Sequence, residues 1–80
     1  MDDLKPLAVF AEVVDAGSMS GAARRVGMSP SAVSQTIRAL ELHGGVTLLH
    51  RSTRKLALTE AGERYYPHCR RMLEAARAAA

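Results

Sequence analysis

The apolar positions in residues 30–42 recur every three or four residues, a spacing that predicts an amphipathic helix. At 100° per residue, Val33, Ile37 and Leu40 fall on one stripe of this helix. The opposite side carries short polar side chains and one cation, namely Ser31, Ser34, Gln35 and Arg38. We expect the stripe to pack on a core and the polar side to remain available to a partner.

A shorter helix is predicted just before it, over residues 19–26, with the small residues Ala22 and Ala23 on its inner side. Gly27 suits the left-handed position that ends many helices. Ser29 can cap the next helix through its hydroxyl, and Pro30 suits that helix's first position, where its missing N–H costs nothing. A stop signal followed so closely by a start signal predicts a helix-turn-helix.

Another helix precedes this pair, capped by Asp2 or Asp3 and ended by Gly17. Its predicted inner stripe is flanked by Phe10 and Val13 and consists of Leu4, Leu7, Ala8, Ala11 and Val14. We therefore expect a core of three helices.

After Leu42 the pattern changes, because Gly44 and Gly45 interrupt the helix. Residues 46–49 and 55–58 then predict two short strands joined by a basic turn, which would form a hairpin, or wing. A plain surface loop is the alternative for this segment. The fold class expected is mainly α: a winged helix-turn-helix over residues 1–58, built from three helices and a two-stranded wing.

A long helix is predicted over residues 59–80, capped by Thr59. Its apolar residues recur at spacings of three and four, and the candidates for pairing with a second copy are Tyr65, Cys69, Met72 and Ala76. Because a small core cannot cover so long a helix, we expect it to form a homodimer, to connect to a further domain, or to do both. Pro67 should kink it, since proline removes the bond to the carbonyl of Glu63.

Length and composition favour one small domain, and a hydrophobic fraction of 48% in 80 residues excludes a disordered chain. The single cysteine, Cys69, cannot form an internal disulfide. No signal peptide and no apolar run near 18 residues is visible. We therefore expect a cytoplasmic protein with no membrane contact.

The net charge of +3 is unevenly distributed. Counting Asp, Glu, Lys and Arg gives −3 for residues 1–20, +5 for residues 21–58 and +1 for the remainder. The positive charge thus surrounds the predicted helix-turn-helix. This distribution favours a polyanionic partner, because neutralised phosphates release counterions.

Catalytic and metal chemistry find no support in the sequence. His43, His50 and His68 lie 7 and 18 residues apart, without a Cys, Asp or Glu partner at metal-ligand spacing. The serines have no neighbouring base, and no phosphate-binding glycine loop is present. We therefore expect no cofactor, no metal and no enzymatic activity.

The sequence resembles the amino-terminal DNA-binding domain of LysR-type transcriptional regulators, because many of its residues match that family's pattern in the same order and at the same spacing. The matching positions are Phe10, Gly17, Ser18, Ala22, Ala23, Ser29, Ala32, Val33, Ser34, Ile37, Leu40, Glu41, Gly45, Val46, Leu48, Leu49, Arg51, Leu58, Thr59, Glu60, Ala61 and Gly62.

This resemblance implies that the third helix reads the major groove of double-stranded DNA, that the wing lies over the adjacent minor groove, and that the long helix forms an antiparallel pair in a homodimer. A small-molecule effector would bind only through a further domain that is not in these residues. Contacts with DNA would come from the residues Ser29, Pro30, Ser31, Ser34, Gln35, Arg38, Arg51, Arg54 and Lys55.

Two residues depart from the family's pattern. Gly44 stands where the family usually has Leu, so the third helix is expected to fray or end early, and Pro67 interrupts the long helix. Two other classes of protein compete with a regulator: a winged-helix module that binds proteins instead of DNA, and the DNA-binding arm of a recombinase. The operator, the direction of regulation and the effector stay open.

Overall fold

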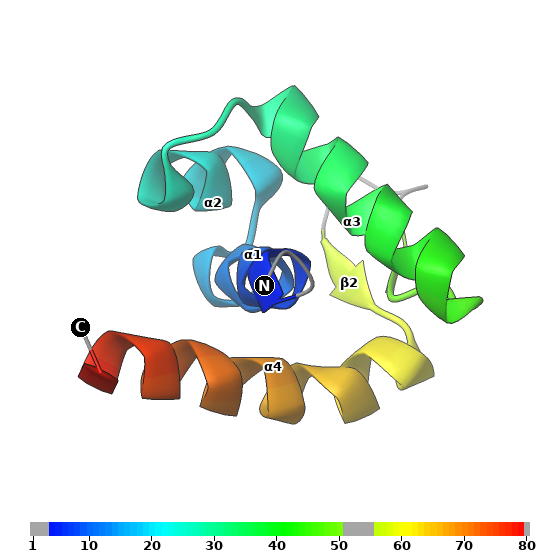
Figure 1. Ribbon diagram of the computed structural model, residues 1–80. Helices are drawn as coiled ribbons and strands as arrows, with labels where there is room; N and C mark the ends of the chain where they lie inside the picture. The colour runs from blue at the N-terminus through cyan, green and yellow to red at the C-terminus, as the bar shows by residue number, and fades with distance from the viewer. Residues whose placement is uncertain (1–3, 51–55, 80) are drawn as a thin grey trace.

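The computed structural model describes residues 4–50 and 56–79. They form four helices and one two-stranded antiparallel sheet (Figure 1). The elements in chain order are α1 (Leu4–Ala16), α2 (Met19–Val26), α3 (Pro30–Gly44), β1 (Leu49–His50), β2 (Ala57–Leu58) and α4 (Glu60–Ala79). The mainly α winged helix-turn-helix predicted from the sequence is confirmed.

The first helix, α1, is the centre of the fold. Figure 1 shows it end-on, with α2 and α3 on one side and α4 on the other. Its buried face is broader than the predicted stripe: Phe10 and Val13, expected at the flanks, are fully buried, while Leu4 is 43% exposed. The predicted stripe was therefore too narrow, because a helix with neighbours on both sides buries more than one stripe.

The helix-turn-helix forms through the local signals that the sequence contains. The Ser18 hydroxyl accepts a hydrogen bond from the backbone N–H of Gly21 and caps α2. Gly27 ends α2 with a φ of 70°, in the left-handed region. The Ser29 hydroxyl then accepts from the N–H of Ala32 at 3.1 Å, and Pro30 occupies the first turn of α3. The predicted stop and start signals are confirmed.

The expected early end of α3 is wrong, because the helix continues through Gly44. Gly45, with a φ of 70°, supplies the left-handed cap, and its N–H donates to the carbonyl of Glu41. Gly44 therefore keeps a helical backbone, although it has no side chain to pack.

The segment after α3 forms a hairpin and not a plain loop. Strand β1 pairs with β2 in antiparallel register, with Leu49 opposite Leu58 and His50 opposite Ala57. Each strand has only two residues, so the sheet is shorter than the sequence predicted. Residues 51–55, which include Arg51, Arg54 and Lys55, lie outside the described residues.

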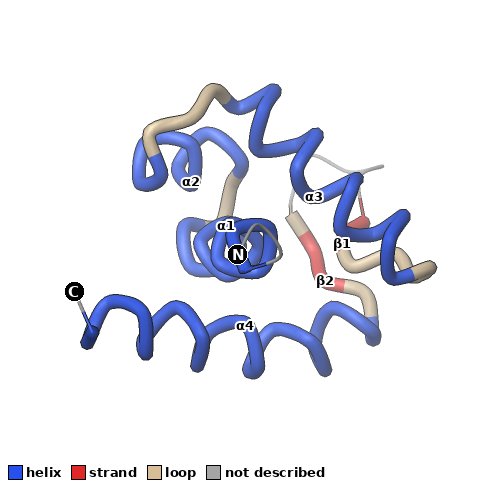
Figure 2. The backbone as a smooth tube through the Cα atoms, in the orientation of Figure 1, coloured by secondary structure: helices blue, strands red, loops and turns tan. Residues whose placement is uncertain are grey.

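Helix α4 crosses α1 and packs against it (Figure 2). The Thr59 hydroxyl accepts from the N–H of Gly62 at 3.0 Å, which confirms the predicted cap. Pro67, where a kink is expected, lies inside α4, and the helix continues past it to Ala79. Residues on both sides of the proline, Tyr65 and Cys69, pack into the core and hold the helix on α1. Within residues 4–50 and 56–79, no helix has both the length and the apolar character needed to cross a membrane.

The first turn of α4 approaches the wing very closely at Gly62. A Cβ atom at this position would overlap the carbonyl oxygen of Leu48 and would lie 3.1 Å from a methyl group of Leu58. That same carbonyl accepts a hydrogen bond of 3.0 Å from the N–H of Thr59. Only glycine lets the wing and α4 join at this distance.

We therefore expect Gly62→Ala to lower the free energy of unfolding by about 1–3 kcal/mol, the usual cost of overpacking. Gly44→Ala is the matched control. A Cβ at Gly44 would meet only Val46 at 3.9 Å, and alanine in a helix stabilises by up to about 1 kcal/mol over glycine. Urea denaturation followed by circular dichroism measures both variants. Equal stability of the two variants would contradict the close contact.

Candidate nucleic-acid interface

The outer face of α3 presents the polar side chains that the sequence singled out. Ser31, Gln35 and Arg38 are exposed, and Ser34 is half-buried on the same helix. Ser29 and Pro30 are exposed at its amino-terminal end. Five of the nine predicted contact residues thus lie on α3, and Ser29 caps its amino-terminal end.

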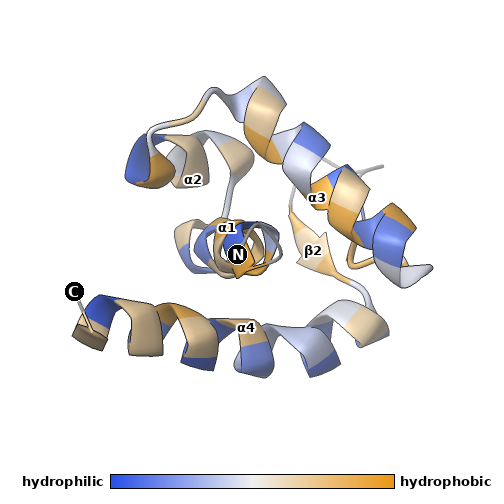
Figure 3. Cartoon of the chain, viewed as in Figure 1, coloured by the Kyte–Doolittle hydropathy of each residue, from blue (hydrophilic) through white to orange (hydrophobic). Residues whose placement is uncertain are grey.

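The inner face of α3 holds the helix firmly in place. Val33 and Ile37 are fully buried, and Leu40 packs partly against the core. Figure 3 shows the hydrophobic side of α3 turned toward α1. The Thr36 hydroxyl donates to the carbonyl of Ala32 at 2.8 Å, which keeps this polar side chain within its own helix. Since the inner face is fixed by packing, the outer side chains are presented on a rigid support.

Leu42 extends the outer face of α3 toward its carboxyl-terminal end. It follows Gln35 by seven residues, which places both side chains on nearly the same side of the helix. Leu42 is 83% exposed, which is unusual for a leucine. Sequence reasoning did not include it, although the seven-residue spacing from Gln35 was a usable signal.

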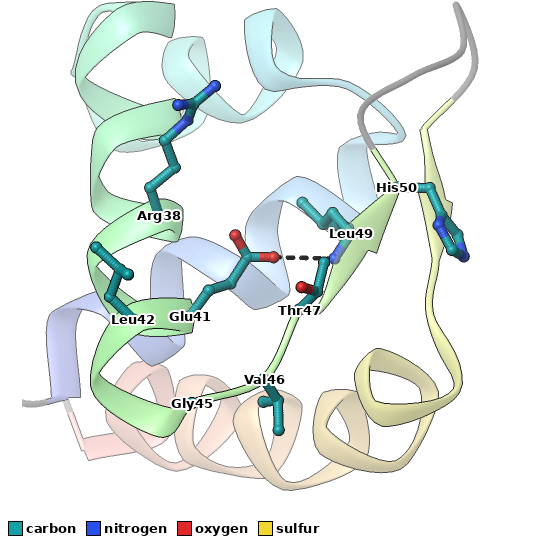
Figure 4. A pocket seen from close by; sticks show the side chains of 8 residues that line it. All are labelled: Arg38, Glu41, Leu42, Gly45, Val46, Thr47, Leu49 and His50. Carbon is teal, nitrogen blue, oxygen red and sulfur yellow. Dashed lines mark hydrogen bonds between the residues drawn. The ribbon is translucent and has the colours of Figure 1, made fainter.

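Glu41 connects the carboxyl-terminal part of α3 to the wing. Its Oε2 accepts hydrogen bonds from the backbone N–H groups of Leu48, at 2.7 Å, and Leu49, at 3.2 Å. Figure 4 shows this side chain reaching from α3 toward β1 across a surface depression. The depression is lined by Arg38, Glu41, Leu42, Gly45, Val46, Thr47, Leu49 and His50.

Sequence reasoning missed this role of Glu41. One signal was available, because Glu41 is the only acidic residue among residues 21–58, a segment that is otherwise basic. A carboxylate kept in such a segment needs a structural reason, and here it binds the two amides that begin the wing. Glu41 therefore fixes the wing relative to the outer face of α3.

The candidate dimerisation residues do not share one exposed surface. Cys69 is 1% exposed in the core, and the ring of Tyr65 packs against Phe10 with the centroids 5.9 Å apart. Their assignment to a dimer surface is therefore corrected: they face α1 because the apolar stripe of α4 is used within the chain. Met72 is half-buried and Ala76 is exposed.

Burial also determines the chemistry of Cys69. Desolvation raises the pKa of its thiol to about 11, so the neutral form prevails at physiological pH. The three histidines, His43, His50 and His68, are all exposed.

A polar contact holds the middle of α4 on α1. The carboxylate of Asp15 accepts a hydrogen bond from the Tyr66 hydroxyl and a second, of 3.2 Å, from Arg70. Arg70 also donates to the Tyr66 oxygen at 2.8 Å and lies 3.4 Å from Glu74. The bond to Asp15, which stabilises the protonated phenol, is the main reason that the pKa of Tyr66 is raised.

These features define a winged helix-turn-helix domain with a long carboxyl-terminal helix. Residues 4–63 match the family described as "Bacterial regulatory helix-turn-helix protein, lysR family". The chain belongs to this family.

Several curated proteins are similar to this chain. It is 53% identical over 76 residues to a probable HTH-type transcriptional regulator, LtrA of Klebsiella pneumoniae, a match that covers 95% of this chain and 25% of that protein. It is 55% identical over 73 residues to the HTH-type transcriptional activator AaeR of Escherichia coli K12, covering 91% and 24%. The chain thus spans about a quarter of the length of these relatives.

Solved structures share the fold. The CbnR_DBD-DNA complex matches with a TM-score of 0.82 and 38% identity, covering 95% of this chain and 87% of that one. The BenM_DBD/benA site 1 DNA complex matches with a TM-score of 0.85 and 28% identity, covering 94% and 84%. Both similar structures contain DNA.

The role of Glu41 is testable by truncation. Glu41→Ala leaves two backbone N–H groups without their charged acceptor, so we expect the free energy of unfolding to fall by about 1.5–3 kcal/mol. Glu74→Ala is the control, because it removes an exposed acid that pairs only weakly with Arg70, and it should change stability by about 0.5 kcal/mol or less. Chemical denaturation compares them. If the two variants prove equally stable, the wing does not depend on Glu41.

Proposed function

We propose that this domain binds double-stranded DNA with sequence specificity, as the DNA-binding part of a bacterial transcriptional regulator. The observation that carries the proposal is the exposed polar face of α3, presented on a helix whose other face is buried. Membership of the lysR family and the similarity to two domains solved with DNA support the same function.

Helix α3 would enter the major groove with its outer face toward the bases. Its short serine side chains permit close approach, while Gln35 and Arg38 are long enough to bond base edges. Ser29 and Pro30 stand at the positive, amino-terminal end of the helix, where free amides favour a phosphate. Readout and positioning would thus come from the same helix.

The wing would add contacts beside the groove that α3 occupies. Strand β1 ends at His50 and β2 begins at Ala57, so Arg51, Arg54 and Lys55 belong to the sequence that joins the strands. Arginine in this position can enter a narrow minor groove or neutralise phosphates. We propose this role for Arg54 and backbone contacts for the other two.

Two copies would pair through α4, as the family resemblance implies, and hold two copies of α3 in successive major grooves about 34 Å apart. Since Tyr65 and Cys69 are used inside the chain, the surface for this pairing would be the side of α4 turned away from α1. Figure 3 shows hydrophilic residues on that side. Met72 and Ala76 remain candidates at its edge.

The curated relatives are about four times as long as this chain. A small-molecule effector would therefore act through a part of a longer protein beyond these residues. A regulator of this kind would work in the bacterial cytoplasm, where its DNA is.

A winged-helix module that binds proteins is the remaining alternative from another class. If the domain is such a module, neither heparin nor bulk DNA at low salt should displace a partner bound to the outer face of α3. The exposed Arg38, and the absence of exposed acids on the outer face of α3 within residues 30–44, count against it.

Gln35 provides the test of direct base readout. The preferred site is first obtained by selection from random duplexes, and binding is then measured on duplexes altered at each base pair. Gln35→Ala should change the preference at one position per half-site, by about 1–3 kcal/mol, because its amide bonds a base edge. His43→Ala, which truncates an exposed side chain in the last turn of the same helix, should leave every preference unchanged. Equal weakening of Gln35→Ala on all duplexes would instead assign Gln35 to the scaffold.

Arg54 provides the test of backbone contact. Arg54→Ala should weaken binding to every duplex and reduce the slope of log affinity against log salt by about 0.9 for each phosphate that the variant no longer neutralises. Arg71→Ala is the charge-matched control, since Arg71 is exposed on α4, on the far side of α1 from α3 (Figure 1). Fluorescence anisotropy at several salt concentrations gives both slopes. Identical slopes for the two variants would exclude Arg54 from the phosphate contacts.

A further inference from the structure

Glu12 is a carboxylate buried where three helices meet. Its side chain is only 5% exposed, and it lies on α1 beside the apolar core residues Val9 and Val13. Its Oε2 accepts a hydrogen bond of 3.1 Å from Nη2 of Arg77, near the end of α4. Its Oε1 lies 3.8 Å from Nη1 of Arg25, on α2.

This arrangement is more than an ordinary surface ion pair. A buried charge is costly unless it is paired, and buried pairs add little to stability compared with apolar side chains of the same size. Within residues 4–50 and 56–79, Oε1 has no hydrogen-bond partner, so the carboxylate is not fully satisfied. A residue that is expensive to bury and incompletely paired is poorly explained by stability alone.

The position of the two partners suggests what Glu12 does. Arg25 belongs to the helix-turn-helix, whereas Arg77 stands on α4, about two turns beyond Arg70. Asp15 holds the middle of α4 on α1, and Glu12 holds its later part. One carboxylate therefore connects the far end of α4 to both α1 and α2.

We propose that Glu12 is a positioning residue that sets the angle between α4 and the helix-turn-helix, and through this angle the half-site spacing that a dimer accepts on DNA. This inference rests on the proposed pairing of two copies through α4. A rotation about α1 moves α3 relative to α4, and so changes the separation along the duplex of the two copies of α3 in a dimer. Small changes at Glu12 thus act on spacing and not on base readout.

Arg77 is the better residue to change first, because its side chain is 60% exposed and its truncation leaves the core intact. The affinity of the chain is measured for duplexes that carry two selected half-sites, whose separation is varied in single base-pair steps. It is also measured for a duplex with one half-site. Arg77→Ala should reduce the preference for the best spacing over its neighbours by at least about threefold, since affinity depends exponentially on the free energy of an interaction. Binding to the single half-site should stay within about twofold of the parent chain.

Further variants separate positioning from folding. Arg77→Lys keeps a cation near Glu12 and should restore most of the spacing preference. Glu12→Gln should resemble Arg77→Ala, and adding Arg77→Ala to it should change nothing further, because both remove the same ion pair. Lys5→Ala, which truncates an exposed cation on α1 that takes part in none of the proposed contacts, should leave the spacing profile unaltered.

Three results would overturn the inference. If Arg77→Ala binds every duplex more weakly by the same factor and its spacing profile is unchanged, Glu12 only stabilises the fold. A parent chain that binds one half-site but shows no spacing preference removes the dimer on which the inference rests, while DNA binding stands. A parent chain that binds no selected duplex would overturn the proposed function itself, and the inference with it.

Discussion

The packing of α1 between the helix-turn-helix and α4 is the constraint on which the rest of the structure depends. Phe10 and Val13 are fully buried there, so one helix contributes to two contacts at once. Without α1, α3 would have nothing on which to rest its apolar side, and α4 would lose its only extensive neighbour among the described residues. The rigidity of the outer face of α3 follows from this central packing and not from α3 alone.

Local signals made the helix-turn-helix predictable from the sequence. Ser18, Gly27, Ser29 and Pro30 act through the backbone of their own neighbourhood, so their roles do not depend on distant residues. The outer face of α3 was predictable for a related reason, because a helix with one apolar stripe leaves the opposite side to solvent. The same reasoning could not determine which bases those side chains read.

The errors arose where distant parts of the chain meet. The stripe of α4 was interpreted as a surface for a second copy, since periodicity shows that a face is apolar but not what covers it. The inner face of α1 was predicted too narrow because its second neighbour, α4, begins 44 residues after α1 ends. Glu12 and Glu41 escaped notice for the same reason: each binds residues on other elements, and a lone acid in a sequence does not reveal its partners.

The burial of Cys69 has a consequence for how this molecule can be observed. It is the only thiol of the chain, and it lies in the contact between α1 and α4 with its ionisation suppressed. An alkylating reagent in solution can reach the sulfur only when the two helices separate. The rate of covalent labelling therefore counts openings of this one contact, and the protein carries its own reporter for the motion of α4 without any added dye.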